Sequence, residues 1–179
     1  MILNLPIFLT LLRILAIPLV VLFFYLDMPL TASTIFGLAG LTDFIDGYVA
    51  RKYNQESRFG AFLDPVADKL LVAVALILIV EREGWFWITL AAILIISREI
   101  TISALREWMA ETGQRSKVAV AYIGKVKAVT QIFSLIFLLY NQDLWGMPLR
   151  EVGLFFLLVA TILTMVSMVQ YLASAFRQD

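Results

Sequence analysis

The chain has 179 residues, of which 61% are hydrophobic and 16% are charged, and so apolar a composition excludes an ordinary soluble domain. Lysine plus arginine equals aspartate plus glutamate, at 14 residues each, so the charge balance gives no indication of a nucleic-acid partner. Cysteine and histidine are absent, which excludes disulfides, catalysis by a thiol or imidazole, and the usual zinc ligands.

Six segments are apolar enough to cross a bilayer, which takes about 20 residues. In chain order they are 7–26, 31–50, 63–80, 85–105, 118–140 and 152–175. The first lacks a basic flank and a cleavage pattern, so we expect a retained helix. Short connections favour antiparallel neighbours. The sequence therefore predicts an all-α, polytopic integral membrane protein: a single domain over residues 1–179, folded as a bundle of six transmembrane helices.

Basic residues are concentrated on one side of this predicted bundle. That side carries Arg51, Lys52, Arg58, Arg106, Arg115 and Lys117, whereas the other carries only Arg82 and Arg150, next to acidic residues. The positive-inside rule then places both termini in the cytoplasm. The same orientation puts Trp85, Trp87 and Trp145 at the outer interface, where an aromatic belt is expected.

Charged residues of five helices fall at one depth in this topology. They are Arg13, Asp43, Asp46, Asp64, Asp68, Lys69, Arg98, Glu99, Lys125 and Lys127. A charge at the centre of a bilayer costs at least about 2.5–3.5 kcal/mol, so charged groups within spans indicate a functional site. We expect a polar cavity that opens to the cytoplasm.

Two acidic pairs dominate that cavity. Asp43 and Asp46 are three residues apart on one helix, and Asp64 and Asp68 are four apart on the next, so each pair occupies one helical face. Their mutual repulsion calls for cations. With no histidine or cysteine in the chain, oxygen must supply the ligands, which favours Mg²⁺ or Mn²⁺, as one ion or two.

The stretch from Asp43 to Asp68 resembles the signature of the CDP-alcohol phosphatidyltransferase family, D-x-x-D-G-x-x-A-R-x8-G-x-x-x-D-x-x-x-D. Its fixed positions are present at the family's spacing: Asp43, Asp46, Gly47, Ala50, Arg51, Gly60, Asp64 and Asp68. The resemblance extends to Asn4-Leu5-Pro6 with Thr10 and Arg13, to the stretch from Arg98 to Glu107, and to Gly124-Lys125-Val126-Lys127. The last two stretches resemble bacterial members that use glycerol 3-phosphate.

This resemblance implies transfer of the phosphatidyl group from CDP-diacylglycerol to the hydroxyl of sn-glycerol 3-phosphate, giving phosphatidylglycerophosphate and CMP. It implies two Mg²⁺ or Mn²⁺ ions held by Asp43, Asp46, Asp64 and Asp68, with Asp68 also taking the proton of the acceptor hydroxyl. The residues expected to line the nucleotide of CDP-diacylglycerol are Gly47, Ala50, Arg51, Ser57 and Gly60. It further implies a homodimer in the bacterial cytoplasmic (inner) membrane.

The acceptor carries a phosphate of its own, which needs cations. Arg98 and Arg106 share one helical face, and Lys125 and Lys127 come from the following helix. We expect Arg98, Lys125 and Lys127 to bind this phosphate, with Arg106 as a further candidate.

Simpler explanations stand beside these assignments. Asp64 before Pro65 is a typical N-cap and first helical position, which could coexist with metal binding. Gly37 and Gly40 are best explained by close helix packing. Lys125 and Lys127 could extend to the membrane surface, and Arg98 with Glu99 could be a structural pair.

Two other functions remain open at this point. The same chemistry with another acceptor, such as inositol phosphate or serine, would leave the aspartate motif unchanged. A cation transporter could also use an acidic intramembrane cluster. A transporter is disfavoured because the charges stop in the inner third of the predicted helices, whereas transport needs a path to both faces.

Overall fold

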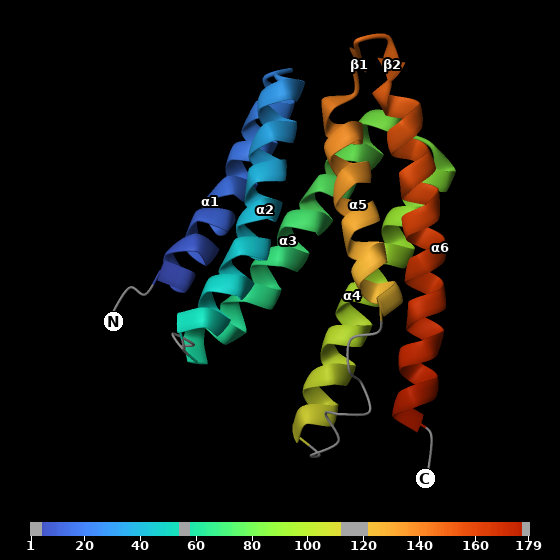
Figure 1. Cartoon of the computed structure of the whole chain (residues 1–179). Helices are drawn as coiled ribbons and strands as arrows, with labels where there is room; N and C mark the ends of the chain where they lie inside the picture. The colour runs from blue at the N-terminus through green and yellow to red at the C-terminus, as the bar shows by residue number, and fades with distance from the viewer. Residues whose placement is uncertain (1–4, 54–57, 112–121, 177–179) are drawn as a thin grey trace.

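The computed structural model describes residues 5–53, 58–111 and 122–176 (Figure 1). This part of the chain forms six α-helices and one short hairpin. In order they are α1 (Leu5–Tyr25), α2 (Pro29–Tyr53), α3 (Arg58–Glu83), α4 (Phe86–Glu111), α5 (Tyr122–Tyr140), β1 (Asp143–Leu144), β2 (Met147–Pro148) and α6 (Leu149–Phe176). The all-α prediction is confirmed, and each predicted apolar segment corresponds to one helix.

Several of these helices have the length and hydropathy of membrane spans. Among the described residues, the stretches Phe8–Tyr25, Phe86–Glu111 and Leu149–Ser174 could each cross a bilayer, and Pro29–Thr42 and Val126–Tyr140 are shorter apolar stretches. Large apolar side chains point outward on these helices, with Leu15, Ile93 and Phe155 each more than half exposed. An aqueous surface of this kind would be unfavourable, whereas lipid accommodates it. The number of spans, six, stays a prediction.

The helices lie in two groups that meet where α2 packs on α5 and α3 packs on α4 and α5 (Figure 1). In one group α1 packs on α2 and α3; in the other α6 packs on α5 and α4. The shared core contains side chains that are fully buried, among them Phe36, Leu76, Ile79, Ile95, Leu135 and Leu138. The ends of α2 and α3 that carry the motif lie at the end of the bundle away from the β1–β2 hairpin (Figure 1).

A charged cluster ties the helices together near the hairpin. Arg82 donates hydrogen bonds to the carbonyl oxygens of Leu138 and Leu139 at the end of α5. The neighbouring Glu83 accepts a hydrogen bond from Arg150 of α6 at 2.6 Å. Since the last carbonyls of a helix lack partners within it, Arg82 also caps α5. These contacts join α3 to both α5 and α6.

The hairpin between α5 and α6 turns at Trp145 and Gly146. Both residues have positive φ angles, 51° and 79°, as the central pair of a type I′ hairpin turn requires. Trp145 is 92% exposed, and Trp85 and Trp87 are also exposed; Trp85 lies against Arg150 at the start of α6, directly after the hairpin. Their position agrees with the predicted aromatic belt.

The expectation that Asp64 caps α3 is wrong. The helix already begins at Arg58, and Pro65 lies inside it. Proline usually marks the first position of a helix, but membrane helices tolerate interior proline because neighbouring groups satisfy the freed backbone. Asp64 therefore has its side chain on the face of a continuous helix.

Gly153 of α6 lies close against α5. A Cβ atom at this position would lie 2.9 Å from Leu138 Cγ and 3.1 Å from Phe137 Cβ. The carbonyl oxygen of Gly153 also accepts a hydrogen bond from the buried Ser134 hydroxyl at 2.9 Å. The two backbones approach because residue 153 has no side chain.

We expect Gly153→Val to destabilise the protein by about 1–3 kcal/mol, because added methyl groups would overpack this contact. Gly37→Ala is the matched control, since its added Cβ would lie 3.4 Å from the flexible end of Ile136. Thermal unfolding in detergent, followed by tryptophan fluorescence, measures both. Equal unfolding temperatures for the two variants would contradict the packing assigned to Gly153.

Candidate active site

A buried arginine organises the carboxylates of α3. Arg13 of α1 is fully buried, and its Nη1 donates to Asp68 Oδ1 at 2.5 Å and lies 3.5 Å from Asp64 Oδ1. Its Nε donates to the carbonyl oxygen of Ala39 in α2 at 3.3 Å. Thr10, one turn before Arg13, donates its hydroxyl hydrogen to Asp64 at 2.7 Å. Two side chains of α1 therefore hold both carboxylates in one orientation.

A second charged network joins α4 to α5. Glu99 accepts a hydrogen bond from Lys127 and another from Arg98, the latter at 3.4 Å. Lys127 and Arg98 are both buried. On α3, Lys69 donates to the hydroxyl of Ser103, also on α4. Glu99 thus shares one negative charge between two buried cations, which lowers the cost of burying them in an apolar bundle.

Arg98 and Arg106 are held by α6. The ring of the buried Tyr171 lies under both guanidinium groups, 5.4 Å from Arg98 Cζ and 5.0 Å from Arg106 Cζ. Arg106 donates to the Tyr171 hydroxyl at 2.6 Å, and Arg98 donates to the hydroxyl of Ser167 at 3.0 Å. Cation–π stacking and these hydrogen bonds fix the direction of both arginines.

A cavity of about 210 Å³ separates the two networks. Its polar lining comes from Asp68 and Lys69 of α3, Glu99 of α4, and Lys127 and Gln131 of α5. The Asp68 carboxylate and the Lys127 network therefore face one space. Apolar residues, among them Phe36 and Leu71, complete the lining, and the polar cavity open to the cytoplasm stays a prediction. Arg98 and Arg106 are outside the lining of this cavity within the described residues.

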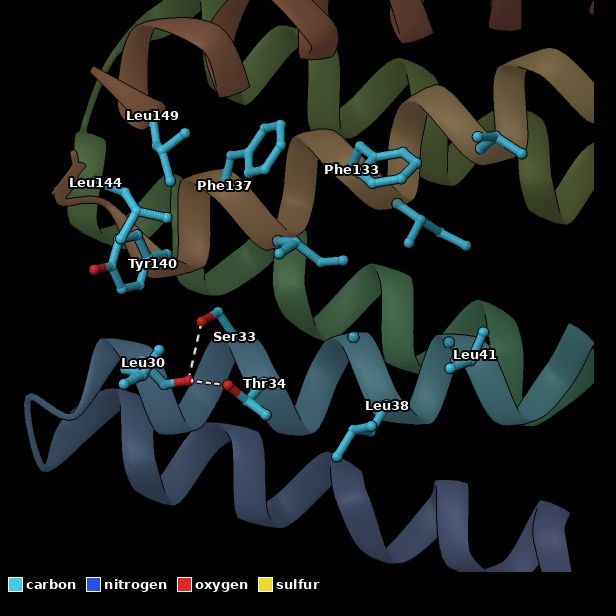
Figure 2. A pocket seen from close by; sticks show the side chains of 15 residues that line it. Leu30, Ser33, Thr34, Leu38, Leu41, Phe133, Phe137, Tyr140, Leu144 and Leu149 are labelled. Atoms are coloured by element: carbon cyan, nitrogen blue, oxygen red, sulfur yellow. Dashed lines mark hydrogen bonds between the residues drawn. The ribbon is translucent and has the colours of Figure 1, made fainter. Parts of the chain in front are cut away.

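An apolar groove of about 600 Å³ runs between α2 and α5 (Figure 2). Leucine and phenylalanine side chains line it along most of its length. The hydroxyls of Ser33 and Thr34 donate to the carbonyl oxygen of Leu30 in their own helix, so they add little polarity (Figure 2). Gly40 and Ile132 line both this groove and the polar cavity. The two spaces are therefore adjacent.

Part of the predicted site lies outside the described residues. Ser57 is outside them entirely. For seven other predicted residues, the structure describes the helix that contains them but not their surroundings: Asp43, Asp46, Gly47, Ala50, Arg51, Gly60 and Lys125. Of the remaining predicted residues, the structure brings Asp68 and Lys127 to one cavity, with Asp64 joined to Asp68 through Arg13. Arg98 is linked to them through Glu99.

Sequence reasoning missed several partners of these residues. Ser167 and Tyr171, which hold the two arginines, are four residues apart on α6. With the buried Thr164 they form a polar stripe at helical spacing in a largely apolar helix, and this stripe is the signal that could have found them. Gln131 belongs to a similar stripe on α5, where it lies between the buried Lys127 and Ser134 at helical spacing; the prediction used only the lysine.

The described carboxylates fit a hard divalent cation. Asp64 and Asp68 share one face of α3, and their side chains are 34% and 39% exposed, so both retain accessible oxygens. No group of three or more possible metal ligands occurs within the described residues, where Asp43 and Asp46 have no described side chains. The donor set consists of carboxylate oxygens, as Mg²⁺ and Mn²⁺ prefer.

Comparison with known proteins identifies the family. The family model of the CDP-alcohol phosphatidyltransferases matches residues 3–172. A protein of Escherichia coli (strain K12), named CDP-diacylglycerol–glycerol-3-phosphate 3-phosphatidyltransferase, is 52% identical over 175 residues, covering 96% of this chain and 94% of the relative. A relative with the same name from Shigella flexneri serotype 5b (strain 8401) is 51% identical over the same coverage. The chain therefore belongs to the CDP-alcohol phosphatidyltransferase family.

Proposed function

We propose that this protein transfers the phosphatidyl group of CDP-diacylglycerol to sn-glycerol 3-phosphate, releasing phosphatidylglycerophosphate and CMP. The observation that carries the proposal is the shared cavity, in which the motif carboxylate Asp68 faces the basic residues Lys69 and Lys127. A carboxylate opposite ammonium groups suits an acceptor that has both a hydroxyl to deprotonate and a phosphate to bind. The names of the relatives support the same acceptor.

In this reaction the acceptor hydroxyl oxygen attacks the phosphorus that carries the diacylglycerol. The bond from that phosphorus to the oxygen shared with the cytidine phosphate breaks, and CMP leaves. Asp68 takes the hydroxyl proton. Arg13 and Thr10, through their contacts with Asp68 and Asp64, keep the carboxylates oriented. Such positioning supplies much of the catalysis of phosphoryl transfer.

We assign the divalent ions, two of Mg²⁺ or Mn²⁺, to Asp43, Asp46, Asp64 and Asp68. When bound, they would neutralise the phosphates and stabilise the leaving CMP. The nucleotide of the lipid donor would lie along Gly47, Ala50, Arg51, Ser57 and Gly60, whose small side chains leave room for it and whose arginine suits a phosphate.

We assign the acceptor phosphate to Arg98, Lys125 and Lys127, with Arg106 as a further candidate. Lys127 reaches the cavity directly. Glu99 accepts hydrogen bonds from Lys127 and Arg98, and an incoming phosphate would compete with it for both cations. Tyr171 and Ser167 then act as positioning residues for the two arginines.

The apolar groove suits an acyl chain of the lipid donor. It is adjacent to the polar cavity through Gly40 and Ile132, and its volume of about 600 Å³ is within the usual range of ligand pockets, about 300–1,000 Å³. Because residues 37 and 40 are glycines, no side chain projects from α2 into the groove at these two positions. A lipid could thus present its pyrophosphate to the carboxylates while one chain remains in the groove.

The distribution of basic residues supports a site on the cytoplasmic side of the bacterial cytoplasmic membrane, with both termini on that side. The homodimer expected from the family resemblance stays a prediction.

We expect Asp68→Asn to lower the rate of CMP release by about 10²–10⁴-fold, because general-base catalysis contributes that much. Purified protein would be assayed with CDP-diacylglycerol and Mg²⁺ or Mn²⁺, with glycerol 3-phosphate, inositol phosphate and serine offered separately. A chelator should abolish release. Asp143→Asn, on the exposed hairpin, is the control and should keep full activity.

If CMP were released only with another acceptor, that acceptor would replace glycerol 3-phosphate in the proposal, and the proposed mechanism would stand. No release with any acceptor, from folded wild-type protein, would refute the transferase proposal and return the acidic cluster to cation transport.

Filling the groove tests the acyl-chain assignment. Gly37→Leu should raise the KM for long-chain CDP-diacylglycerol about tenfold. The added side chain would displace about two methylene groups of the acyl chain from the groove, and their lost burial accounts for a change of that size. A short-chain analogue should be affected much less. Ala173→Leu adds the same side chain to an exposed position of α6 and should change neither KM. An equal effect of Gly37→Leu on both lipids would exclude the groove as the chain site.

A further inference from the structure

Gln131 is buried, polar and unused by the mechanism above. The residue is 3% exposed and lies one helical turn from Lys127 on α5. It lines the polar cavity together with Asp68, Glu99 and Lys127. A glutamine on this face of an apolar helix has a side chain long enough to reach a small molecule in the cavity.

The carboxamide oxygen of Gln131 is unsatisfied. Its Oε1 atom is buried and has no hydrogen-bond partner among the residues that the structure describes. Nearby buried hydroxyls behave differently: Ser134 donates to the carbonyl of Gly153, and Thr164 to that of Ala160. A buried acceptor without a partner is costly, so a donor supplied by a ligand would stabilise this position.

The chemistry of the cavity selects the donor. A phosphate carries acceptor oxygens and would go to Lys127 and the other cations, away from the amide oxygen. A hydroxyl group can donate to Oε1. Glycerol 3-phosphate has two hydroxyls, of which one reacts at Asp68, and the secondary hydroxyl is left without an assigned contact.

We propose that Gln131 accepts a hydrogen bond from the secondary hydroxyl of glycerol 3-phosphate and so contributes to the choice of acceptor. This inference rests on the proposed function. It makes Gln131 a binding residue on the glycerol side of the acceptor, whereas the cations bind its phosphate.

The test compares two acceptors in the full-length protein. Glycerol 3-phosphate and 3-hydroxypropyl phosphate differ in the secondary hydroxyl alone, and CMP release with each gives kcat/KM. The wild type should prefer glycerol 3-phosphate. In Gln131→Met, which keeps the length of the side chain without its amide, we expect this preference to fall about five- to tenfold, mainly through the KM of glycerol 3-phosphate. The value for the analogue should change little.

Gln170→Met is the matched control, because Gln170 is exposed on α6, and it should keep the wild-type preference. Gln131→Asn, which withdraws the amide by one methylene, is a second variant in case Gln131→Met fails to fold, and it should lose preference as well. A merely structural role of Gln131 would lower activity with both acceptors equally, and this outcome would overturn the proposal.

Two further results separate the proposals. A wild type that uses both acceptors equally well would overturn the role of Gln131 and leave the transferase function intact, with water as the partner of Oε1. A wild type that releases no CMP with either acceptor would instead refute the proposed function on which the inference rests.

Discussion

The structure depends on the neutralisation of one buried cation. Arg13 lies in the interior of the bundle with no exposure to solvent, where an unpaired charge would cost several kcal/mol. Asp64 and Asp68 supply the counter-charge, and the carbonyl oxygen of Ala39 accepts a further hydrogen bond. The same contacts that make the arginine tolerable also fix α1, α2 and α3 relative to one another. Packing and the orientation of the motif carboxylates therefore have a common cause.

In the group formed by α4, α5 and α6, buried charges are also neutralised by pairing, but there a carboxylate lies between cations. There the carboxylate of Glu99 is the bridging group, and the cations Arg98 and Lys127 surround it. One network presents a carboxylate to the cavity and the other presents an ammonium group. Each side of this space carries both signs, because Asp68 is next to Lys69 on α3 and Glu99 of α4 is paired with Lys127 of α5.

Much of this could be predicted from the sequence. The helices followed from the length of the apolar segments, and the common depth of the charges predicted that charged side chains of α3, α4 and α5 would meet. Periodicity fixes the depth of a side chain but does not identify the neighbour it faces, so the pairs Arg13–Asp68 and Arg106–Tyr171 required the structure. Pro65 misled because the rule for helix starts comes from proteins in water, where interior proline leaves a carbonyl unsatisfied.

The adjacency of groove and cavity has a consequence for how the two substrates meet. The lipid donor is dissolved in the bilayer, whereas glycerol 3-phosphate is dissolved in water. A site that admitted both through one opening would have to expose apolar walls to water or charged groups to lipid. Here Gly40 and Ile132 are the only residues that the groove and the cavity share in the described part of the chain. Under the proposed acyl-chain assignment, the chain and the acceptor approach from different sides, and only the reacting phosphate needs to cross between them. Residue 40 must stay small for that reason: a larger side chain on α2 would close the connection without disturbing either network of charges.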